Sequence, residues 1–180
     1  MKVGRAAKAL LPTEPVYDSV GSQPQGRDPV AAFVALGANL GDAAHTVRAA
    51  LVALSQVPGV QRVRGSSLYR TAPVDSTGPD YINAVAEVVT TLGAPSLLAA
   101  LQAIENGAGR ERPYRNAPRT LDLDLLLYGS ARIDSFALTL PHPRMGSRAF
   151  VLVPLAEIAP QCVSAAQLQA VADQAIEILP

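Results

Sequence analysis

The sequence has no net charge, a single cysteine and no long apolar run. Fifteen Lys and Arg residues balance fifteen Asp and Glu residues, which argues against non-specific binding to duplex nucleic acid, since that requires a basic surface. The lone Cys162 excludes an internal disulfide, as suits a reducing compartment. No apolar stretch approaches the roughly 20 residues that span a bilayer, and Lys8 and Pro12 interrupt the N-terminal one. We therefore expect a cytoplasmic protein without signal peptide or membrane partner.

What remains is the composition of one ordinary globular domain. The chain has 180 residues, of which 49% are hydrophobic, enough to bury a core of its own. Residues 1–28 mix Gly, Pro, Ser, Gln and charge without periodicity, so we expect a disordered tail there. The folded domain is expected to cover residues 29–180.

Hydrophobic periodicity in this domain predicts alternating strands and helices. Strands are expected at 30–37, 60–71, 81–92 and 121–129, and helices at 42–56 and 95–106. A hairpin-like segment at 131–140 and two helices at 150–158 and 164–178 are expected to follow. The order β-α-β-β-α-β predicts an α+β, ferredoxin-like fold, in which an antiparallel sheet carries helices on one face, with additional C-terminal helices.

Two aspartates interrupt the leucine-rich strand in the stretch PRTLDLDLLLY. Asp122 and Asp124 share one face of that strand, and the leucines between them share the other. At ~6 Å and an effective dielectric constant near 20, two such carboxylates repel each other by roughly 3 kcal/mol. A cation between them would remove that repulsion, and Mg²⁺ is held by carboxylates together with water and phosphate. A solvated sheet face is the alternative explanation.

The segment before this strand is rich in arginine. RERPYRNAPR (110–119) carries Arg110, Arg112, Arg115 and Arg119 against one acid, Glu111. Guanidinium groups bind phosphate oxygens through two hydrogen bonds at once. Next to a carboxylate pair, such a loop is typical of a metal–nucleotide site, although salt bridges to the same aspartates would also explain it. A Walker A pattern is absent, so a P-loop would not hold the phosphates.

Three weaker sets of polar residues accompany these two. One face of the second predicted helix presents residues at i, i+4 and i+7, namely Leu98, Gln102 and Glu105. Tyr81 and Asn83 share a strand face, and an asparagine offers both donor and acceptor to a flat heterocycle. His142 lies between two prolines in LPHPRMGSRAF. Core packing, a solvated helix face and a structural histidine are the alternatives here.

In combination, these motifs resemble the 6-hydroxymethyl-7,8-dihydropterin pyrophosphokinase family. The motifs are VALGANLGD, LYRTAPV, PDYINAV, the helix with Glu105, GRER, APRTLDLDLLLYG and LPHPRMGSRAFVLVPL. They occur in order over roughly residues 30 to 160. The resemblance implies a transferase of folate biosynthesis that moves pyrophosphate from ATP to the reduced pterin and yields AMP and the pterin diphosphate.

The resemblance also implies roles for individual positions. The catalytic set would be Arg110, Arg119, Asp122 and Asp124, and the two aspartates would hold two Mg²⁺ ions. The ATP positions would be Leu98, Gln102, Glu105, Arg110, Arg112, Arg119, Leu125, Thr139, His142 and Arg148. The pterin positions would be Thr71, Val74, Tyr81, Asn83 and Phe150, with Phe150 stacked on the ring. The loops at 72–80 and 110–118 would close over both substrates, and we expect a monomer.

The chain departs from the family pattern at two motif positions, and its residues 1–28 have no counterpart in the minimal enzyme of the family. Asn116 stands where some members have a tryptophan, and Pro143 replaces a tyrosine after the histidine. From the residues alone, two other functions stay open. A ferredoxin-like RNA- or metal-binding module would also have this fold and a basic loop. RNA-binding modules of that shape, however, display stacking aromatics on the sheet, whereas this chain has five tyrosines, three phenylalanines and no tryptophan. A two-metal phosphohydrolase or nuclease would release phosphate or cleave nucleic acid instead of forming AMP.

Overall fold

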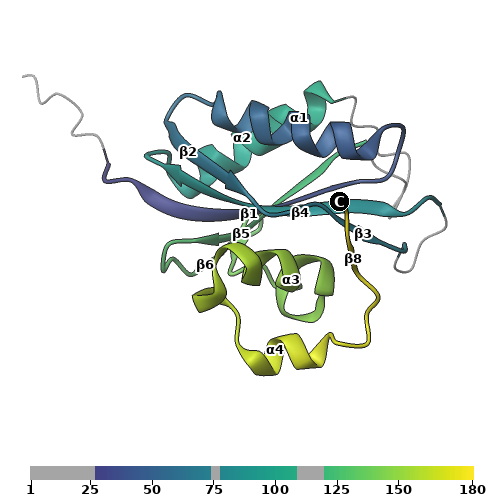
Figure 1. Ribbon diagram of the computed structural model, residues 1–180. Coiled ribbons are helices and arrows are strands. Elements are labelled where there is room, and N and C mark those ends of the chain that lie inside the picture. Colours follow the sequence, from purple (N-terminus) through teal and green to yellow (C-terminus); the bar gives the residue numbers. More distant parts are fainter. Residues whose placement is uncertain (1–26, 74–77, 109–119) are drawn as a thin grey trace, which may run out of the picture.

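The computed structural model describes residues 27–73, 78–108 and 120–180, and its centre is an antiparallel sheet with helices on both faces (Figure 1). The strands are β1 (Val30–Ala38), β2 (Val60–Gly65), β3 (Tyr69–Thr71), β4 (Tyr81–Thr90), β5 (Asp122–Tyr128), β6 (Ile133–Asp134), β7 (Thr139–Leu140) and β8 (Glu177–Ile178). The helices are α1 (Ala43–Ser55), α2 (Ala94–Gly107), α3 (Ala149–Ile158) and α4 (Ala165–Ala170), with two 3₁₀ turns at Met145–Ser147 and Pro160–Cys162.

The sheet has the strand order predicted for a ferredoxin-like fold. β1 lies between β5 and β4, and β2 and β3 both pair with the other side of β4. Every one of these pairs is antiparallel. The predicted order β-α-β-β-α-β is therefore confirmed, with the second strand divided in two. The expected tail at 1–28 falls almost wholly outside the described residues.

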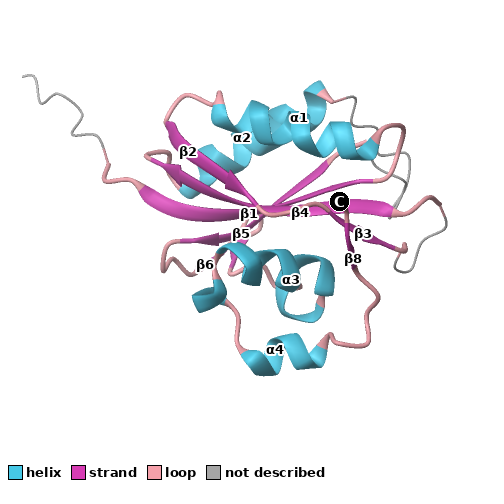
Figure 2. Cartoon of the chain, viewed as in Figure 1, coloured by secondary structure: helices cyan, strands magenta, loops and turns pink. Residues whose placement is uncertain are grey.

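The two faces of the sheet carry separate hydrophobic clusters. On β1, alternate residues such as Val34 and Leu36 pack under α1 and α2, whereas Phe33 and Ala35 pack against α3. Figure 2 shows α1 and α2 on one side of the sheet and α3 and α4 on the other. Because β1 is covered on both faces, its sequence is apolar throughout. Within the described ranges, no helix has the length and apolar character needed to cross a membrane.

The predicted strand at 60–71 is interrupted at residues 66–68. There the Ser66 N–H donates to Val85 O at 2.8 Å, and the Val85 N–H donates to Ser66 Oγ at 3.0 Å. The side chain of Ser66 thus replaces one backbone partner, and the chain leaves the regular ladder before β3 resumes it. A side-chain hydrogen bond of this kind competes with strand pairing.

The predicted helix at 164–178 is wrong beyond its first turns. The helical segment α4 ends at Ala170, and β8 instead pairs with β3, with Ile178 opposite Tyr69. The Leu179 N–H also donates to Leu68 O at 2.8 Å. An open strand edge presents backbone donors and acceptors that need partners. Pairing with that edge outweighs the helix propensity of the last residues, which is a weak preference.

One carboxylate of α3 is hydrogen-bonded to the sheet at two neighbouring residues. Glu157 accepts hydrogen bonds from the Ser67 N–H at 3.0 Å, from Ser67 Oγ at 2.9 Å and from the Tyr69 hydroxyl at 2.8 Å. Burial and the bond to Glu157 raise the pKa of Tyr69 to about 12. Burial acts to raise the pKa of Glu157, but its hydrogen bonds to Ser67 and Tyr69 outweigh burial and lower it. Glu157 therefore connects α3 to the interruption between β2 and β3.

This arrangement makes part of the stability dependent on pH. Because the pKa of Glu157 is lower in the folded chain than its ordinary value of 4.5, its stabilisation is present above pH 4.5 and is lost as the pH falls through the folded value. Glu157→Gln should destabilise the protein at pH 7 by about 1 kcal/mol after allowance for solvent screening. That corresponds to a melting temperature roughly 2–4 °C lower.

Thermal unfolding between pH 3 and pH 7 tests the prediction. The difference between wild type and Glu157→Gln should shrink as the pH falls. Glu177→Gln is the matched control, because its side chain is 74% exposed and its ion pair with Arg70 is long, at 3.9 Å. A difference for Glu157→Gln that stays constant across this range would contradict the argument.

Candidate active site

The aspartate pair lies where the alternation of its strand predicts. Leu123 and Leu125 are buried in the cluster under α1 and α2. Asp122 and Asp124 are partly buried and point to the opposite sheet face, where Leu126, two residues farther on, packs in the α3 cluster. The predicted separation of a leucine face from an aspartate face is confirmed.

Two polar residues, Glu105 and His142, form hydrogen bonds with the backbone of the edge strand β5. The Leu123 N–H donates to Glu105 Oε1 at 2.9 Å, and the His142 N–H donates to Leu126 O at 2.9 Å. Glu105 is only 2% exposed, so the structure gives this carboxylate a backbone-holding role. Its implied contact with the nucleotide stays a prediction. Gln102, one turn earlier on α2, is exposed.

One cross-strand row connects the aspartates to the implied pterin positions. Gly37 on β1 pairs with Asp122 on one side and with Asn83 on the other. Two strand spacings separate these side chains, about 10 Å. A side chain at Gly37 would fill the interval, since a Cβ there would lie 3.3 Å from Asn83 Oδ1. The row therefore leaves an open strip of sheet between a carboxylate and an amide.

The amide of Asn83 has a fixed orientation. Asn83 is 4% exposed, and its Nδ2 donates to Thr71 Oγ1 at 2.9 Å. Tyr81 pairs with Thr71 across the same two strands. At the start of α3, the guanidinium carbon of Arg148 lies 5.3 Å from the ring centroid of Phe150, a cation–π distance. The structure thus gathers Thr71, Tyr81 and Asn83 on β3 and β4, and places Phe150 at the start of α3, while Val74 lies outside the described residues.

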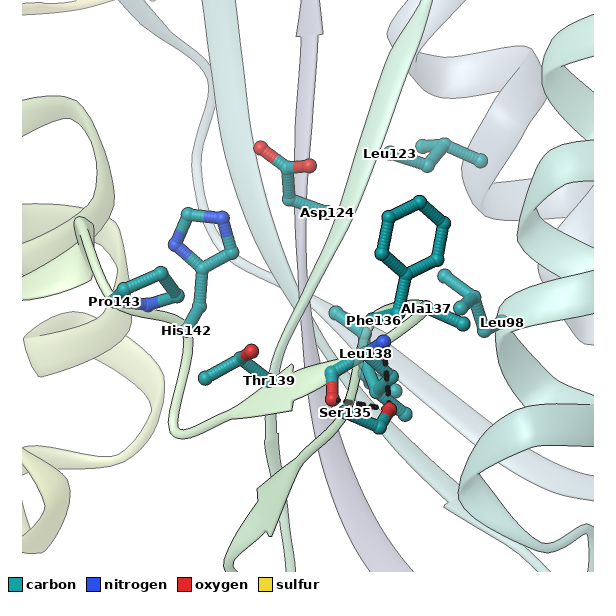
Figure 3. Close-up of a pocket in the computed structure, with 11 residues that line it drawn as sticks. Leu98, Leu123, Asp124, Ser135, Phe136, Ala137, Leu138, Thr139, His142 and Pro143 are labelled. Carbon is teal, nitrogen blue, oxygen red and sulfur yellow. Dashed lines mark hydrogen bonds between the residues drawn. The ribbon is translucent and has the colours of Figure 1, made fainter.

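An open cavity of about 280 Å³ adjoins Asp124 at the edge of β5. Its lining combines residues of α2, β5 and the β6–β7 hairpin, and it includes the implied nucleotide positions Leu98, Leu125, Thr139 and His142 together with Asp124 (Figure 3). Most of the other lining residues are apolar. The cavity therefore has an apolar wall and a charged end. Arg110, Arg112 and Arg119, together with Asn116, lie outside the described residues.

Burial favours the neutral form of His142 at the charged end of the cavity. Burial lowers the pKa of His142; the carboxylates of Asp124 and Asp122 oppose this effect, and the cations Arg148 and Arg144 add to it. The Arg144 N–H donates to His142 Nδ1 at 3.3 Å. With Nδ1 accepting, Nε2 carries the proton of the neutral ring. His142 is thus a hydrogen-bond donor beside Asp124.

Gln174, in the C-terminal segment, holds the backbone on either side of Arg148. The sequence did not predict this role of Gln174. Gln174 Oε1 accepts from the Ala149 N–H at 2.9 Å, and Gln174 Nε2 donates to Ser147 O at 3.0 Å. These two bonds hold the backbone on both sides of Arg148. No local pattern indicates such a role, because the partners lie 25 and 27 residues apart.

The two carboxylates fit Mg²⁺ in its usual mode. Within the described part of the chain, no group of three or more His, Cys, Asp and Glu residues is arranged as a metal site. Mg²⁺ does not require such a group, because it is commonly bound by one or two carboxylates with water and substrate phosphates. Asp122 and Asp124, two residues apart on one strand face, supply that ligand set.

Together, the fold and this site define a ferredoxin-like α+β protein with an apolar cavity beside a carboxylate pair. A family model described as 7,8-dihydro-6-hydroxymethylpterin-pyrophosphokinase matches residues 33–160. The chain therefore belongs to the hydroxymethyldihydropterin pyrophosphokinase family, as the sequence motifs predict.

Curated relatives support this assignment at high identity. The 2-amino-4-hydroxy-6-hydroxymethyldihydropteridine pyrophosphokinase of Haemophilus influenzae is 47% identical over 74% of this chain and 84% of its own length. The protein of the same name from Synechocystis is 46% identical over 73% and 68%. Among solved structures, a Plasmodium falciparum HPPK-DHPS chain superposes with a TM-score of 0.60 at 13% identity, over 76% of this chain and 41% of that one. The likeness to that structure supports the fold alone.

Removing the side chain of Gln174 should loosen the backbone beside Arg148. In Gln174→Ala, the Ala149 amide loses its acceptor, and we expect its hydrogen exchange to become about tenfold faster, since a lost hydrogen bond is worth about 1 kcal/mol. Gln174→Glu keeps an acceptor and should retain more protection. Exchange measured by NMR or mass spectrometry checks this, with Gln169→Ala, at an exposed position on α4, as the control. Equal exchange rates in Gln174→Ala and wild type would exclude the positioning role.

Proposed function

We propose that the cavity, the aspartate pair and the Asn83 row form one site that transfers pyrophosphate from ATP to 6-hydroxymethyl-7,8-dihydropterin. The reaction follows from membership of the family, whose activity is this transfer in folate biosynthesis. The observation that carries the site assignment is the position of the aspartates. Asp124 lines the cavity, and Asp122 pairs through Gly37 with Asn83, so the carboxylates lie between the two proposed subsites.

The cavity is proposed as the ATP subsite. Its apolar wall, which includes Leu98 and Leu125, suits a purine base, and Thr139 adds a hydroxyl. Its charged end suits the phosphates, because neutral His142 can donate from Nε2 and Arg148 brings positive charge near that ring. Gln102 and Glu105 on α2, together with Arg110, Arg112 and Arg119, complete the proposed set through the resemblance.

The Asn83 row is proposed as the pterin subsite. Asn83 offers an oriented amide to the edge of a flat heterocycle, since Thr71 already holds Nδ2. The absence of a side chain at Gly37 leaves room for such a ring to extend toward Asp122. Phe150 would stack on the ring, and Tyr81 would lie at its border. Val74 is assigned to this subsite by the resemblance.

Asp122 and Asp124 are proposed to hold the two Mg²⁺ ions that would accompany ATP. When bound, Mg²⁺ would neutralise charge on the phosphates. The side chains of the protein then act by position and charge. Asp122 and Asp124 hold the reacting end between the subsites, His142 and Arg148 contact phosphate oxygens, and the pterin hydroxymethyl oxygen attacks the β-phosphorus while AMP leaves. We assign no general base among these residues.

Three further expectations belong to this proposal. The protein is expected to act as a monomer, and its partners are ATP and the reduced pterin without nucleic acid or membrane. A cytoplasmic location remains the expectation from the sequence.

Removing one charge from the pair should strongly reduce turnover. Asp124→Asn preserves the shape of the side chain but weakens cation binding, and we expect AMP formation to fall about 10²–10³-fold, the range seen when one stabilising group is lost from an active site. The measurement is AMP production from ATP and Mg²⁺, with and without the pterin. Asp173→Asn is the matched control, because Asp173 is exposed and outside the proposed subsites.

The same assay separates the competing functions. Pterin-dependent AMP supports the transfer. Release of inorganic phosphate without pterin would indicate a phosphohydrolase, and cleavage of added nucleic acid a nuclease. Wild-type turnover by a folded Asp124→Asn variant would exclude the cation-binding role of the pair.

Freeing the amide of Asn83 should weaken pterin recognition selectively. Thr71→Val removes the acceptor of Asn83 Nδ2 and leaves a buried donor, which costs about 1–3 kcal/mol. We expect the KM for the pterin to rise about tenfold while the KM for ATP is unchanged. Thr90→Val is the control, because Thr90 is also buried and donates to a backbone oxygen, Gly59 O, far along the chain. Equal increases in both KM values for Thr71→Val would contradict the assignment.

A further inference from the structure

Phe136 at the tip of the β6–β7 hairpin is exposed to an unusual degree. Its relative exposure is 110%, whereas the other large exposed hydrophobic residues in the described part of the chain, Leu40, Val52 and Ile178, reach 37%, 57% and 55%. A phenylalanine that buries no surface contributes nothing to the core. Its position therefore calls for an explanation outside folding stability.

The tip that carries Phe136 is held in place by its own hydrogen bonds. The Ser135 N–H and the Ser135 hydroxyl both donate to Leu138 O, at 3.1 and 2.9 Å, and the Leu138 N–H donates to Ser135 Oγ at 3.1 Å. Behind the tip, Asp134 pairs with Thr139, and Leu138 packs against the main core. The turn therefore presents the ring from a fixed support, which lowers the entropy lost when a ligand binds.

The ring lies at the apolar side of the cavity. Phe136 and Leu98 lie on one side in Figure 3, whereas His142 and Pro143 lie on the other. The carboxylate of Asp124 lies between Phe136 and His142 in this view and forms the charged end of the cavity. Of the residues that line the cavity, Phe136 is the only one with a benzene ring. A ligand that matches this lining has a flat aromatic part at Phe136 and, at Asp124, a phosphate part that carries a cation with it.

We propose that Phe136 forms an aromatic wall for the purine base of ATP, with Leu98 as an apolar wall of the same subsite. This inference rests on the proposed function, and it adds a base-binding residue that neither the motifs nor the resemblance assigns. A base stacked on an aromatic side chain is recognised through its π-face. The exposed ring then becomes buried only when the nucleotide is bound.

The test is direct binding of AMP and of inorganic tripolyphosphate, each with Mg²⁺, by calorimetry on the full chain. Phe136→Ala should weaken AMP about tenfold, the magnitude of a lost base–aromatic contact, and leave tripolyphosphate unchanged. Phe136→Tyr should bind AMP as wild type does, and Phe136→Leu should be intermediate. Val52→Ala is the control, since it removes another exposed apolar side chain, on α1. Because Phe136 is fully exposed, its variants should melt at the wild-type temperature.

The remaining outcomes each overturn the inference. Unchanged AMP binding by Phe136→Ala would exclude the stacking role, and equal weakening of AMP and tripolyphosphate would assign the effect to a displaced hairpin. A loss of oligomer mass in Phe136→Ala, measured by light scattering, would identify the ring as a contact between protein chains. The proposed function fails separately, if the wild-type protein forms no AMP from ATP in the presence of the pterin.

Discussion

The register of β1 between β5 and β4 is the constraint on which the rest of the site depends. It sets Gly37 opposite both Asp122 and Asn83, and Ala35 opposite Asp124. Because side chains alternate along a strand, a shift of β5 by one residue would turn both aspartates into the cluster under α1 and α2 and expose the leucines. The hydrophobic pattern of β5 thus enforces the position of its charges. The same register of β1 with its two neighbours therefore buries the leucines in the core and places the aspartates at the site.

This register explains how a strand in a hydrophobic sheet keeps two carboxylates. The α3 cluster covers the aspartate face only at one end, around Leu126, and Asp122 and Asp124 stay partly exposed beyond it. Charges of both signs lie near this face, because the carboxylates of Asp124 and Asp122 and the cations Arg148 and Arg144 all affect the pKa of His142. A bound cation would reduce the repulsion between the two carboxylates.

The sequence predicted the local features of the fold and site because those features repeat at short spacing. The alternation in LDLDL gave the two faces of β5, and the element order gave the ferredoxin-like sheet. Contacts between distant residues were not predictable in this way. Gln174 reaches Ala149 across 25 residues, and Glu157 reaches Ser67 across 90. The end of the chain was misassigned as helix for the same reason, since β8 exists only because β3 offers an edge.

Several polar residues near the site hold the backbone by hydrogen bonds within the protein itself. Glu105 holds the edge of β5, Gln174 holds the chain beside Arg148, and Glu157 fixes the far end of α3. A motif match cannot separate such residues from those that touch ligand, because loss of either kind lowers activity. The two kinds of residue differ physically. A residue that holds the backbone is buried, or makes two hydrogen bonds within the protein, before any ligand binds. By that criterion Phe136 lies at the opposite extreme, since its ring buries no surface until a ligand supplies a partner.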